Sequence, residues 1–327
     1  MIEARGLART FRTRGRTTDA VRGVDLDVAA GELVGFLGPN GAGKTTTLRM
    51  LTTLLRPTAG TATVAGRDLA GDPLGVRRRI GYVGQTGGTR PEARVHEELE
   101  AIGRLYGRTK SDARARTVAL ADRLDLTDLL RRPVKALSGG QRRRLDIAMG
   151  LVHDPRLVFL DEPTAALDPR SRANVWQHIR ALREQHGTTV FLTTHYLDEA
   201  DALCDRVLVI DNGTIVATGA PAELKARVAG DLVAVGVEHR DLPRVAEIAA
   251  RIPRSSEVAT VERGVQFRVP RGDLAMPELL RALDVADIAT TSLRVHQPTL
   301  DDVFLTLTGR TIRDAELSTE QEAPVGA

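Results

Sequence analysis

Four short runs of apolar residues recur along the first two thirds of the chain. Runs this short and this apolar are typical of strands that are buried on both faces, and the segments between them are long enough for helices. The alternation predicts an α/β fold built on a mostly parallel sheet. The four runs are Leu33–Leu37, Leu157–Leu160, Thr189–Leu192 and Val207–Ile210.

Two neighbouring patterns predict antiparallel strands. Val24–Val28 alternates apolar and acidic residues, as a strand with one solvated face does. The tripeptide Asp211-Asn212-Gly213 follows the fourth apolar run and is typical of a tight hairpin, so Thr214–Thr218 is expected to return as the paired strand. The sequence therefore adds an antiparallel β subdomain to the parallel core.

The segment between Arg90 and Leu137 has a different character. Val95–Tyr106 and Ser111–Leu130 both have helical patterns, and no buried-strand run lies between or beside them. We interpret this part of the chain, at about residues 90–150, as a helical insertion into the α/β core.

The pattern changes again near Gly230, and beyond this point the sequence contains no phosphate-binding or metal-binding motif. The predicted order of elements is β-α-β-β-α-β, which suggests a small ferredoxin-like α+β sandwich. These elements are strands over Leu232–Val237, Val258–Glu262, Val265–Val269 and Ile288–Val295, and helices over Asp241–Arg251 and Asp273–Leu283.

A last helix is expected over Pro298–Leu307, because apolar residues recur there at helical spacing on one face. Those residues are Leu300, Val303, Phe304 and Leu307. The residues from Asp314 onward are polar and acidic, which predicts a disordered tail. We therefore divide the chain into a large domain (1–229), a small accessory or regulatory domain (230–310) and a tail (311–327).

Composition and charge exclude several classes of protein. The chain has 327 residues and a net charge of only +3, and its charges are interspersed, so no nucleic-acid partner is expected. Cys204 is the single cysteine, which excludes a disulfide within the chain and fits a reducing compartment. No apolar stretch approaches the roughly 18–20 residues of a membrane span, and the first residues lack the apolar region of a signal peptide. We expect this chain to reach a membrane only through a partner.

The octet Gly38 to Thr45, Gly-Pro-Asn-Gly-Ala-Gly-Lys-Thr, carries the clearest chemistry and is called the phosphate loop below. It fits the G-x-x-x-x-G-K-[ST] pattern, in which glycines let backbone N–H groups curl around phosphate oxygens. Lys44 can reach the β and γ phosphates, and the Thr45 hydroxyl can bind Mg²⁺. The preceding apolar run and the helix expected over Thr45–Leu55 provide the strand and the helix N-terminus that this loop requires.

Asp161 and Glu162, called the acid pair below, follow the apolar run that ends at Leu160. The end of a parallel strand beside a phosphate loop is where Mg²⁺ must be held. Asp161 is therefore expected to bind Mg²⁺ through water, and Glu162 to polarise the attacking water as a general base. The alternative is that both are surface acids after a core strand.

Leu137–Gln141, Leu-Ser-Gly-Gly-Gln, is the most discriminating segment and is called the signature segment below. Ser138 can cap a helix that begins near Gln141, and Gly139 and Gly140 expose backbone N–H groups at the positive end of that helix. The chain thus has a second helix N-terminus suited to phosphate.

At this point residues 1–225 resemble the ATP-binding subunits of ABC transporters. In that family Gln85 matches the glutamine that senses Mg²⁺ and the attacking water, Asp168 belongs to the loop that crosses between partners, and His195 matches the histidine at the γ phosphate. Each has an ordinary alternative: Gln85 as a loop residue, His195 as a strand-end histidine, and Asp168 as the start of a helix with Pro169 in first position.

The resemblance implies that two such chains pair head to tail and enclose two ATP molecules with Mg²⁺. It implies catalytic roles for Lys44, Gln85, Glu162 and His195, and metal binding by Thr45, Gln85 and Asp161. The nucleotide contacts that it implies are Phe11, Gly38, Asn40, Gly41, Gly43, Lys44, Thr45, Thr46, Ser138, Gly139, Gly140, Gln141 and Asp168.

Two features depart from the family pattern. Arg142, Arg143 and Arg144 follow the signature segment where glutamine is more usual. We interpret these arginines as a solvated helix face, with a role toward phosphate or a partner as the alternative. Phe11 is the aromatic residue placed to stack on adenine, but its spacing to Lys44 is long, so packing in the core stays open for its ring.

The segment Gln297–Gly309 resembles the ending of ATPases of the daunorubicin/doxorubicin-resistance type. This resemblance implies a homodimer on the cytoplasmic face of the membrane, bound to separate integral membrane subunits and exporting a hydrophobic compound. Residues 85–106 are the candidates for contact with those subunits. The alternative is a soluble ABC-type ATPase acting on ribosomes or DNA, whereas the signature segment opposes a small-molecule kinase. The sequence does not identify the cargo, which the membrane subunits select.

Overall fold

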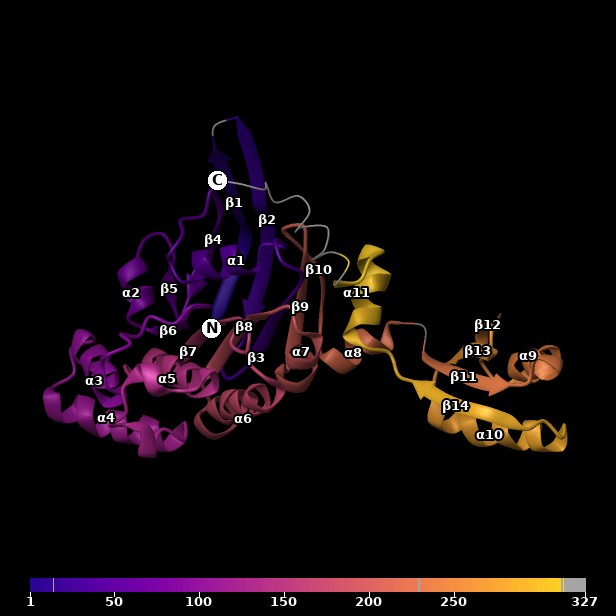
Figure 1. The fold of residues 1–327 in the computed structure, drawn as a ribbon. Coiled ribbons are helices and arrows are strands. Elements are labelled where there is room, and N and C mark those ends of the chain that lie inside the picture. Colours follow the sequence, from indigo (N-terminus) through magenta and orange to yellow (C-terminus); the bar gives the residue numbers. More distant parts are fainter. Residues whose placement is uncertain (14, 229, 313, 315–327) are drawn as a thin grey trace. The chain divides into compact units, whose positions relative to one another are not determined.

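The computed structural model of the protein describes residues 1–13, 15–228, 230–312 and 314 (Figure 1). They form two compact units, Met1–Pro221 and Ala222–Thr311, and Ile312 groups with the first. None of the helices in these described ranges combines the length and the apolarity that crossing a bilayer requires.

A six-stranded sheet forms the centre of the first unit. Its order is β10-β9-β3-β8-β7-β6, and every pair of neighbours is parallel except β9 and β10, which form the hairpin expected at Asn212. All four predicted buried strands are therefore confirmed. The bounds are β3 (Leu33–Leu37), β6 (Ile80–Val83), β7 (Leu157–Asp161), β8 (Thr189–Thr194), β9 (Arg206–Asp211) and β10 (Thr214–Gly219).

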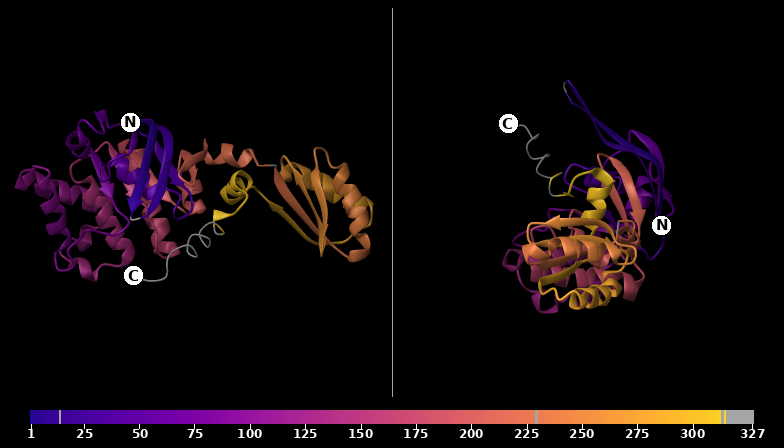
Figure 2. Two further views of the ribbon diagram at one scale, coloured as in Figure 1. Left: turned by 90° about the horizontal axis from the view of Figure 1, so that it is seen from above. Right: turned by 90° about the vertical axis from the view of Figure 1, so that its right-hand side faces the viewer.

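A second, antiparallel sheet has the order β2-β1-β4-β5. Val24–Val28 is the end of strand β2, as predicted. The alternating pattern revealed only this part of the β1–β2 hairpin, which is much longer and whose far end projects from the rest of the sheet in Figure 2 (right). One apolar core joins this sheet to the central sheet and α1, with Ile2, Phe36 and Leu48 among its members. The bounds are β1 (Ile2–Thr13), β2 (Arg16–Val28), β4 (Ala59–Val64), β5 (Arg67–Asp68) and α1 (Lys44–Leu51).

The helix predicted to reach Leu55 ends at Leu51. Thr53 has a φ of 63°, in the left-handed region that a right-handed helix cannot continue through. The N–H groups of Leu54 and Leu55 turn back and both donate to the carbonyl of Arg49.

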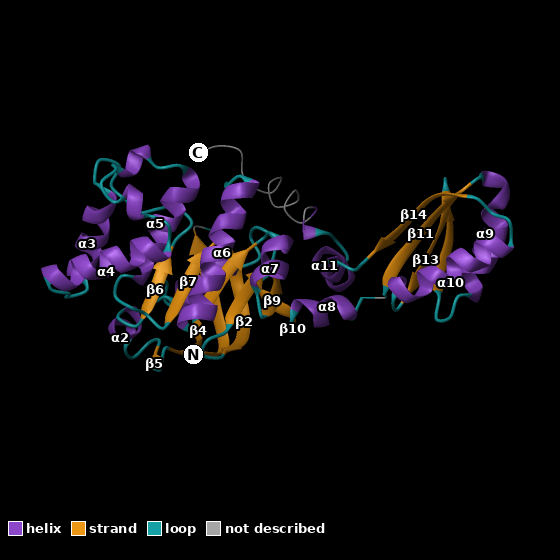
Figure 3. Ribbon diagram, turned by 90° about the horizontal axis from the view of Figure 1, so that it is seen from below, coloured by secondary structure: helices purple, strands orange, loops and turns teal. Residues whose placement is uncertain are grey.

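Helices α5, α6 and α7 cover the face of the central sheet that is opposite α1 and the antiparallel sheet (Figures 1 and 3). Helix α3 confirms the predicted helix over Val95–Tyr106, whereas the helix predicted over Ser111–Leu130 ends at Arg123. Asp125 there has a φ of 49°, and the chain continues in short 3-10 turns. The bounds are α2 (Pro73–Arg77), α3 (Val95–Leu105), α4 (Lys110–Arg123), η1 (Thr127–Leu129), η2 (Val134–Ala136), α5 (Gly139–Leu151), α6 (Pro169–His186) and α7 (Leu197–Leu203).

The second unit contains an antiparallel sheet of order β12-β13-β11-β14 with helices α9 and α10. This strand order confirms the predicted ferredoxin-like sandwich. Its separate core includes Val233, Phe267 and Leu279. The bounds are α8 (Pro221–Ala226), which begins at the unit boundary, β11 (Asp231–Val237), η3 (His239–Asp241), α9 (Leu242–Arg251), β12 (Ser256–Val261), β13 (Gly264–Val269), α10 (Gly272–Val285) and β14 (Thr290–His296).

Helix α11 (Leu300–Thr308) confirms the predicted last helix. Thr299 and Asp302 cap its start reciprocally, a capping box. Of the apolar positions on its predicted face, Leu300, Val303 and Phe304 are buried, but Leu307 is 45% exposed, so the buried face does not extend to the end of the helix. The tail from residue 315 lies outside the described residues.

Candidate functional site

The phosphate loop connects β3 to α1, and its glycines are required by close backbone contacts. A Cβ added to Gly38 would lie 2.2 Å from the Ile210 carbonyl oxygen, and one on Gly43 would lie 2.5 Å from that of Ala20. Gly43 also has a φ of 104° and caps α1 without a side-chain hydrogen bond. The first N–H groups of α1 thus lack a side-chain cap at the loop, which suits the loop to an anion.

Lys44 places a positive charge inside this loop. Its side chain is almost completely buried, and Nζ donates to the carbonyl oxygens of Gly38 at 2.7 Å and Pro39 at 3.0 Å. The same nitrogen lies 3.7 Å from Glu162 Oε1. The predicted phosphate-binding lysine therefore lies beside the predicted general base. The other predicted contacts in this segment, Asn40, Gly41 and Thr46, belong to the loop and the first turn of α1.

Asp161 is buried at the end of β7 and is surrounded by hydroxyl groups. Its Oδ1 accepts hydrogen bonds from Thr193 Oγ1 at 2.7 Å and from Thr45 Oγ1 at 3.1 Å. Carboxylate and hydroxyl oxygens are the ligands that Mg²⁺ prefers, so this donor set fits a hard cation. Thr45 and Asp161 were predicted from the sequence and Thr193 was not, although a hydroxyl residue at the end of a buried strand was a usable signal.

Glu162 is the residue on which the other predicted catalytic side chains converge. Its Oε2 accepts a hydrogen bond from Gln85 Nε2 at 3.1 Å, and its Oε1 lies 3.3 Å from His195 Nδ1. The backbone N–H of Glu162 donates to Thr193 Oγ1 at 3.0 Å, and its φ of 45° is unusual for a residue with a side chain. The structure therefore brings together the residues that follow β6, β7 and β8 with Lys44 of the phosphate loop.

The charge state of Glu162 follows from these neighbours. Burial by itself raises the pKa of its carboxyl group. The His195 imidazole beside Oε1 and the positive charge of Lys44 outweigh that effect and hold the pKa below its ordinary value. Glu162 is thus ionised at neutral pH, as a group that accepts a proton from water must be.

The signature segment begins α5, and Ser138 caps that helix as predicted. Ser138 Oγ accepts from the N–H of Gln141 at 3.3 Å, and Gln141 Oε1 accepts from the N–H of Ser138 at 3.0 Å. Ser138 and Gly139 are exposed. Gly139 and Gly140 lie beside the segment from Leu167 to Ser171, because a Cβ on Gly139 would lie 3.4 Å from Leu167 and one on Gly140 3.0 Å from Ser171.

Asp168 caps α6, which is the ordinary alternative that its sequence context left open. Its Oδ1 accepts from the N–H of Ser171 at 3.0 Å and its Oδ2 from the Ser171 hydroxyl at 2.6 Å. These bonds lower the pKa of Asp168. Because Asp168 is also exposed, the cap leaves its predicted contact with a partner available.

Phe11 lies near the end of the β1–β2 hairpin, where it pairs with Thr18. Its ring is 37% exposed, which opposes the alternative of packing in the core. The guanidinium of Arg9 lies over the ring, 4.8 Å from its centre, in cation–π geometry. Adenine stacking by Phe11 stays a prediction.

The interpretation of Arg142–Arg144 as one solvated face is wrong for two of the three. Arg142 is exposed, but Arg143 is buried and Arg144 donates to the carbonyl oxygen of Leu124 at 3.0 Å. Consecutive residues of a helix are rotated by about 100°, so three of them cannot share one face. This rotation could have shown from the sequence alone that the three side chains point in different directions.

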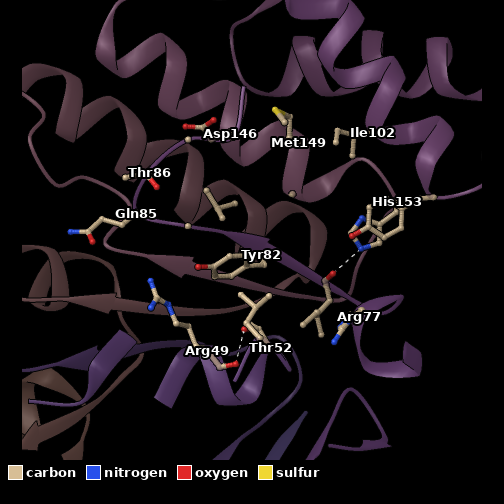
Figure 4. Close-up of a pocket in the computed structure, with 18 residues that line it drawn as sticks. Arg49, Thr52, Arg77, Tyr82, Gln85, Thr86, Ile102, Asp146, Met149 and His153 are labelled. Carbon is tan, nitrogen blue, oxygen red and sulfur yellow. Dashed lines mark hydrogen bonds between the residues drawn. The ribbon is translucent and has the colours of Figure 1, made fainter. Parts of the chain in front are cut away.

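A pocket of about 610 Å³ adjoins Gln85. Figure 4 shows Asp146 and Met149 of α5 across from Arg49 of α1, with Tyr82 between them. Asp146 is buried, its Oδ1 has no hydrogen-bond partner among the described residues, and burial raises its pKa to about 6 against the opposing effect of nearby arginines. The lining also includes Gly84, Thr86, Gly87, Gly88, Ile102 and Tyr106, which fall within or next to the predicted partner region.

Two family models match the chain. Residues 21–165 match the model described as ABC transporter, and residues 219–308 match the C-terminal domain of DrrA1-3-like ATP-binding proteins. The first match includes the phosphate loop, the signature segment and the acid pair.

Similar proteins cover nearly the whole chain. It is 44% identical to the daunorubicin resistance ATP-binding protein DrrA3 of Streptomyces coeruleorubidus, over 90% of this chain and 94% of that protein. It is also 44% identical to the daunorubicin/doxorubicin resistance ATP-binding protein DrrA of Streptomyces peucetius, over 98% and 96%. Among solved structures, the dimeric ATP-binding cassette MJ0796 in a post-hydrolysis state bound to ADP and Pi matches with a TM-score of 0.62 and 25% identity, over 67% of this chain and 98% of that chain.

Proposed function

The chain belongs to the ATP-binding proteins of ABC transporters, and we propose that it is the ATP-hydrolysing motor of an exporter whose membrane-spanning subunits are separate chains. The observation that carries this proposal is the set of contacts around Glu162. Lys44, Gln85 and His195 each lie within 4 Å of its carboxylate, at 3.7, 3.1 and 3.3 Å. This arrangement supports attack by water on a bound phosphate rather than storage of a nucleotide.

In the proposed reaction, water attacks the γ-phosphorus of ATP and the bond to the β–γ bridging oxygen breaks. The Glu162 carboxylate takes the proton of the attacking water, while Gln85 and His195 orient the water and the γ phosphate. Lys44 and the N–H groups of the phosphate loop bind the phosphates. Mg²⁺, held at Thr45, Gln85 and Asp161, would offset the charge of the phosphoryl group in transfer.

We propose that the signature segment serves a second copy of the chain. Ser138 and Gly139 are exposed at the positive end of α5. Gly139 and Gly140 lie beside Leu167 and Ser171, which belong to the loop before α6 and to α6. A head-to-tail homodimer gives this second anion site a ligand, namely the ATP of the partner. The similar cassette MJ0796 is dimeric, which supports this arrangement. Further nucleotide contacts proposed are those of Phe11, Asn40, Gly41, Thr46, Gly140, Gln141 and Asp168.

We also propose that the 610 Å³ pocket receives a segment of the membrane subunit, which holds the chain at the cytoplasmic face. Its lining includes Gln85, so an occupant would lie beside a residue that contacts Glu162. The relatives are named for daunorubicin and doxorubicin resistance, which supports export of a drug-like or other hydrophobic compound.

The test is affinity purification of the tagged Glu162→Gln variant from mildly solubilised native cells with Mg-ATP. We expect a multi-span membrane protein to copurify. Adding Leu54→Asp, a substitution in the pocket lining, should reduce the recovery of this membrane protein roughly tenfold, because a carboxylate buried at the interface opposes docking of the membrane subunit. Leu74→Asp is the matched control, since Leu54 is 56% exposed and Leu74, outside the pocket lining, is 62% exposed. Recovery of ribosomes or DNA-repair proteins instead would favour the soluble ATPase.

We propose that residues 1–229 bind the nucleotide, that 230–310 are an accessory domain, and that the tail adds no site residue. All the proposed site residues lie before residue 229, and the core of the second unit is separate. Removal of residues 231–327 is therefore expected to leave ATP affinity within about threefold of the full chain by fluorescence titration. Loss of binding by a truncated chain with native circular dichroism would contradict this division.

A further inference from the structure

Arg143 lies on α5, just after the signature segment, and its side chain is only 7% exposed. Its guanidinium donates to four backbone carbonyl oxygens. Nη1 bonds to Gly84 at 2.6 Å, and Nε bonds to Pro163 at 2.7 Å. Nη2 bonds to Asp161 at 2.9 Å and to Glu162 at 3.2 Å.

These four carbonyl groups belong to the segments that carry the proposed catalytic contacts. Gly84 immediately precedes Gln85, and Asp161, Glu162 and Pro163 are consecutive at the end of β7. One side chain thus joins the signature helix to both ends of the hydrogen bond between Gln85 and Glu162. Only a planar guanidinium offers enough donors in a fixed fork for such an array.

The array also stabilises an uncommon backbone conformation. Glu162 has a φ of 45°, which costs free energy in a residue with a side chain and persists only where the surroundings hold it. Arg143 contacts the carbonyl groups before, at and after this residue. Arg143 has no carboxylate oxygen within ion-pair distance in the described ranges, and the four hydrogen bonds of its guanidinium all go to backbone oxygens.

We propose that Arg143 is a positioning residue that couples the signature helix to the geometry of Gln85 and Glu162 in the same chain. Any movement of α5 when two chains close around ATP carries the guanidinium with it, and therefore shifts the carbonyl groups on which both side chains depend. The inference rests on the proposed function, in which Glu162 is the general base.

The test compares Arg143→Lys with Arg144→Lys in the full-length chain. Lysine keeps the charge but cannot span four carbonyl groups. We expect kcat for ATP hydrolysis to fall roughly 100-fold in Arg143→Lys, as for a catalytic group misplaced by about 1 Å. The KM and the ATP affinity should stay within about threefold, since no phosphate contact is altered. Arg144→Lys is the matched control, because Arg144 is the next residue of α5 and also donates to backbone carbonyl oxygens, but to those of Leu124 and Asp125. This variant should keep the kcat of the unmodified chain.

A second measurement separates positioning from simple stability. In the Glu162→Gln background, Arg143→Lys should still form the ATP-bound dimer on size-exclusion chromatography, because binding precedes the step that Arg143 supports. A kcat within twofold of the unmodified chain overturns the inference. So does a loss of kcat matched by equal losses of ATP affinity and of dimer, which indicates a folding role only. If Glu162→Gln itself keeps full turnover, the proposed function fails instead.

Discussion

Glu162→Gln is expected to stop ATP turnover while leaving ATP binding and pairing of the chains intact. Glutamine keeps the shape of the side chain and can still contact Gln85 and His195, but it cannot accept a proton from water. General-base catalysis contributes on the order of 100- to 10,000-fold, so kcat should fall by at least about 100-fold. The measurement is phosphate release at saturating Mg-ATP, together with size-exclusion chromatography to detect the trapped dimer.

The matched control is Glu184→Gln, because Glu184 is an exposed residue of α6 that makes no contact with the acid pair among the described residues. It should keep the kcat of the unmodified chain. Retained turnover in Glu162→Gln would contradict the general-base assignment. A variant that loses turnover but stays monomeric with Mg-ATP would contradict the sandwich of two chains.

Lys44→Ala is expected to weaken ATP binding by at least about tenfold, because it removes the phosphate contacts of the ammonium group. The ammonium group is buried within the phosphate loop and bonds to the carbonyl oxygens of Gly38 and Pro39. Loss of one or two charge-assisted hydrogen bonds to phosphate, at about 1.5–3 kcal/mol each, corresponds to a weakening of roughly 10- to 20,000-fold. Equilibrium binding of a fluorescent ATP analogue measures the change.

Lys135→Ala is the control for this experiment. Lys135 is one of only four lysines, and its ammonium pairs with exposed Glu92 at 2.7 Å, away from the phosphate loop. Its removal should leave ATP affinity unchanged, because exposed ion pairs contribute little. If Lys44→Ala binds ATP as tightly as the unmodified chain, the phosphate-loop assignment is wrong.

Local patterns determined most of the fold and the chemical identity of the site. Buried strands such as Leu33–Leu37 are continuously apolar because both of their faces are covered, and this requirement is visible in sequence. The phosphate loop is equally visible, since only glycine fits next to the carbonyl oxygens of Ala20 and Ile210. The signature segment also predicted where its helix starts, because Ser138 and Gln141 are residue types that cap a helix N-terminus together. The helix ends near Thr53 and Asp125 were missed, because a left-handed residue other than glycine carries no clear sequence mark.

Only the tertiary structure showed how residues that are distant in the sequence contact one another. Gln85 lies 77 positions from Glu162, and only the parallel pairing of β6 with β7 brings the two segments to the same sheet edge. Thr193 contacts Asp161 for the same reason, through the pairing of β8 with β7. The burial of the Arg143 side chain could not be predicted from the sequence either, because a run of three arginines does not show which of them faces the interior when the helix packs. Sequence patterns record what each segment requires of its own surroundings, whereas contacts between segments depend on sheet order and helix packing, which no single segment contains.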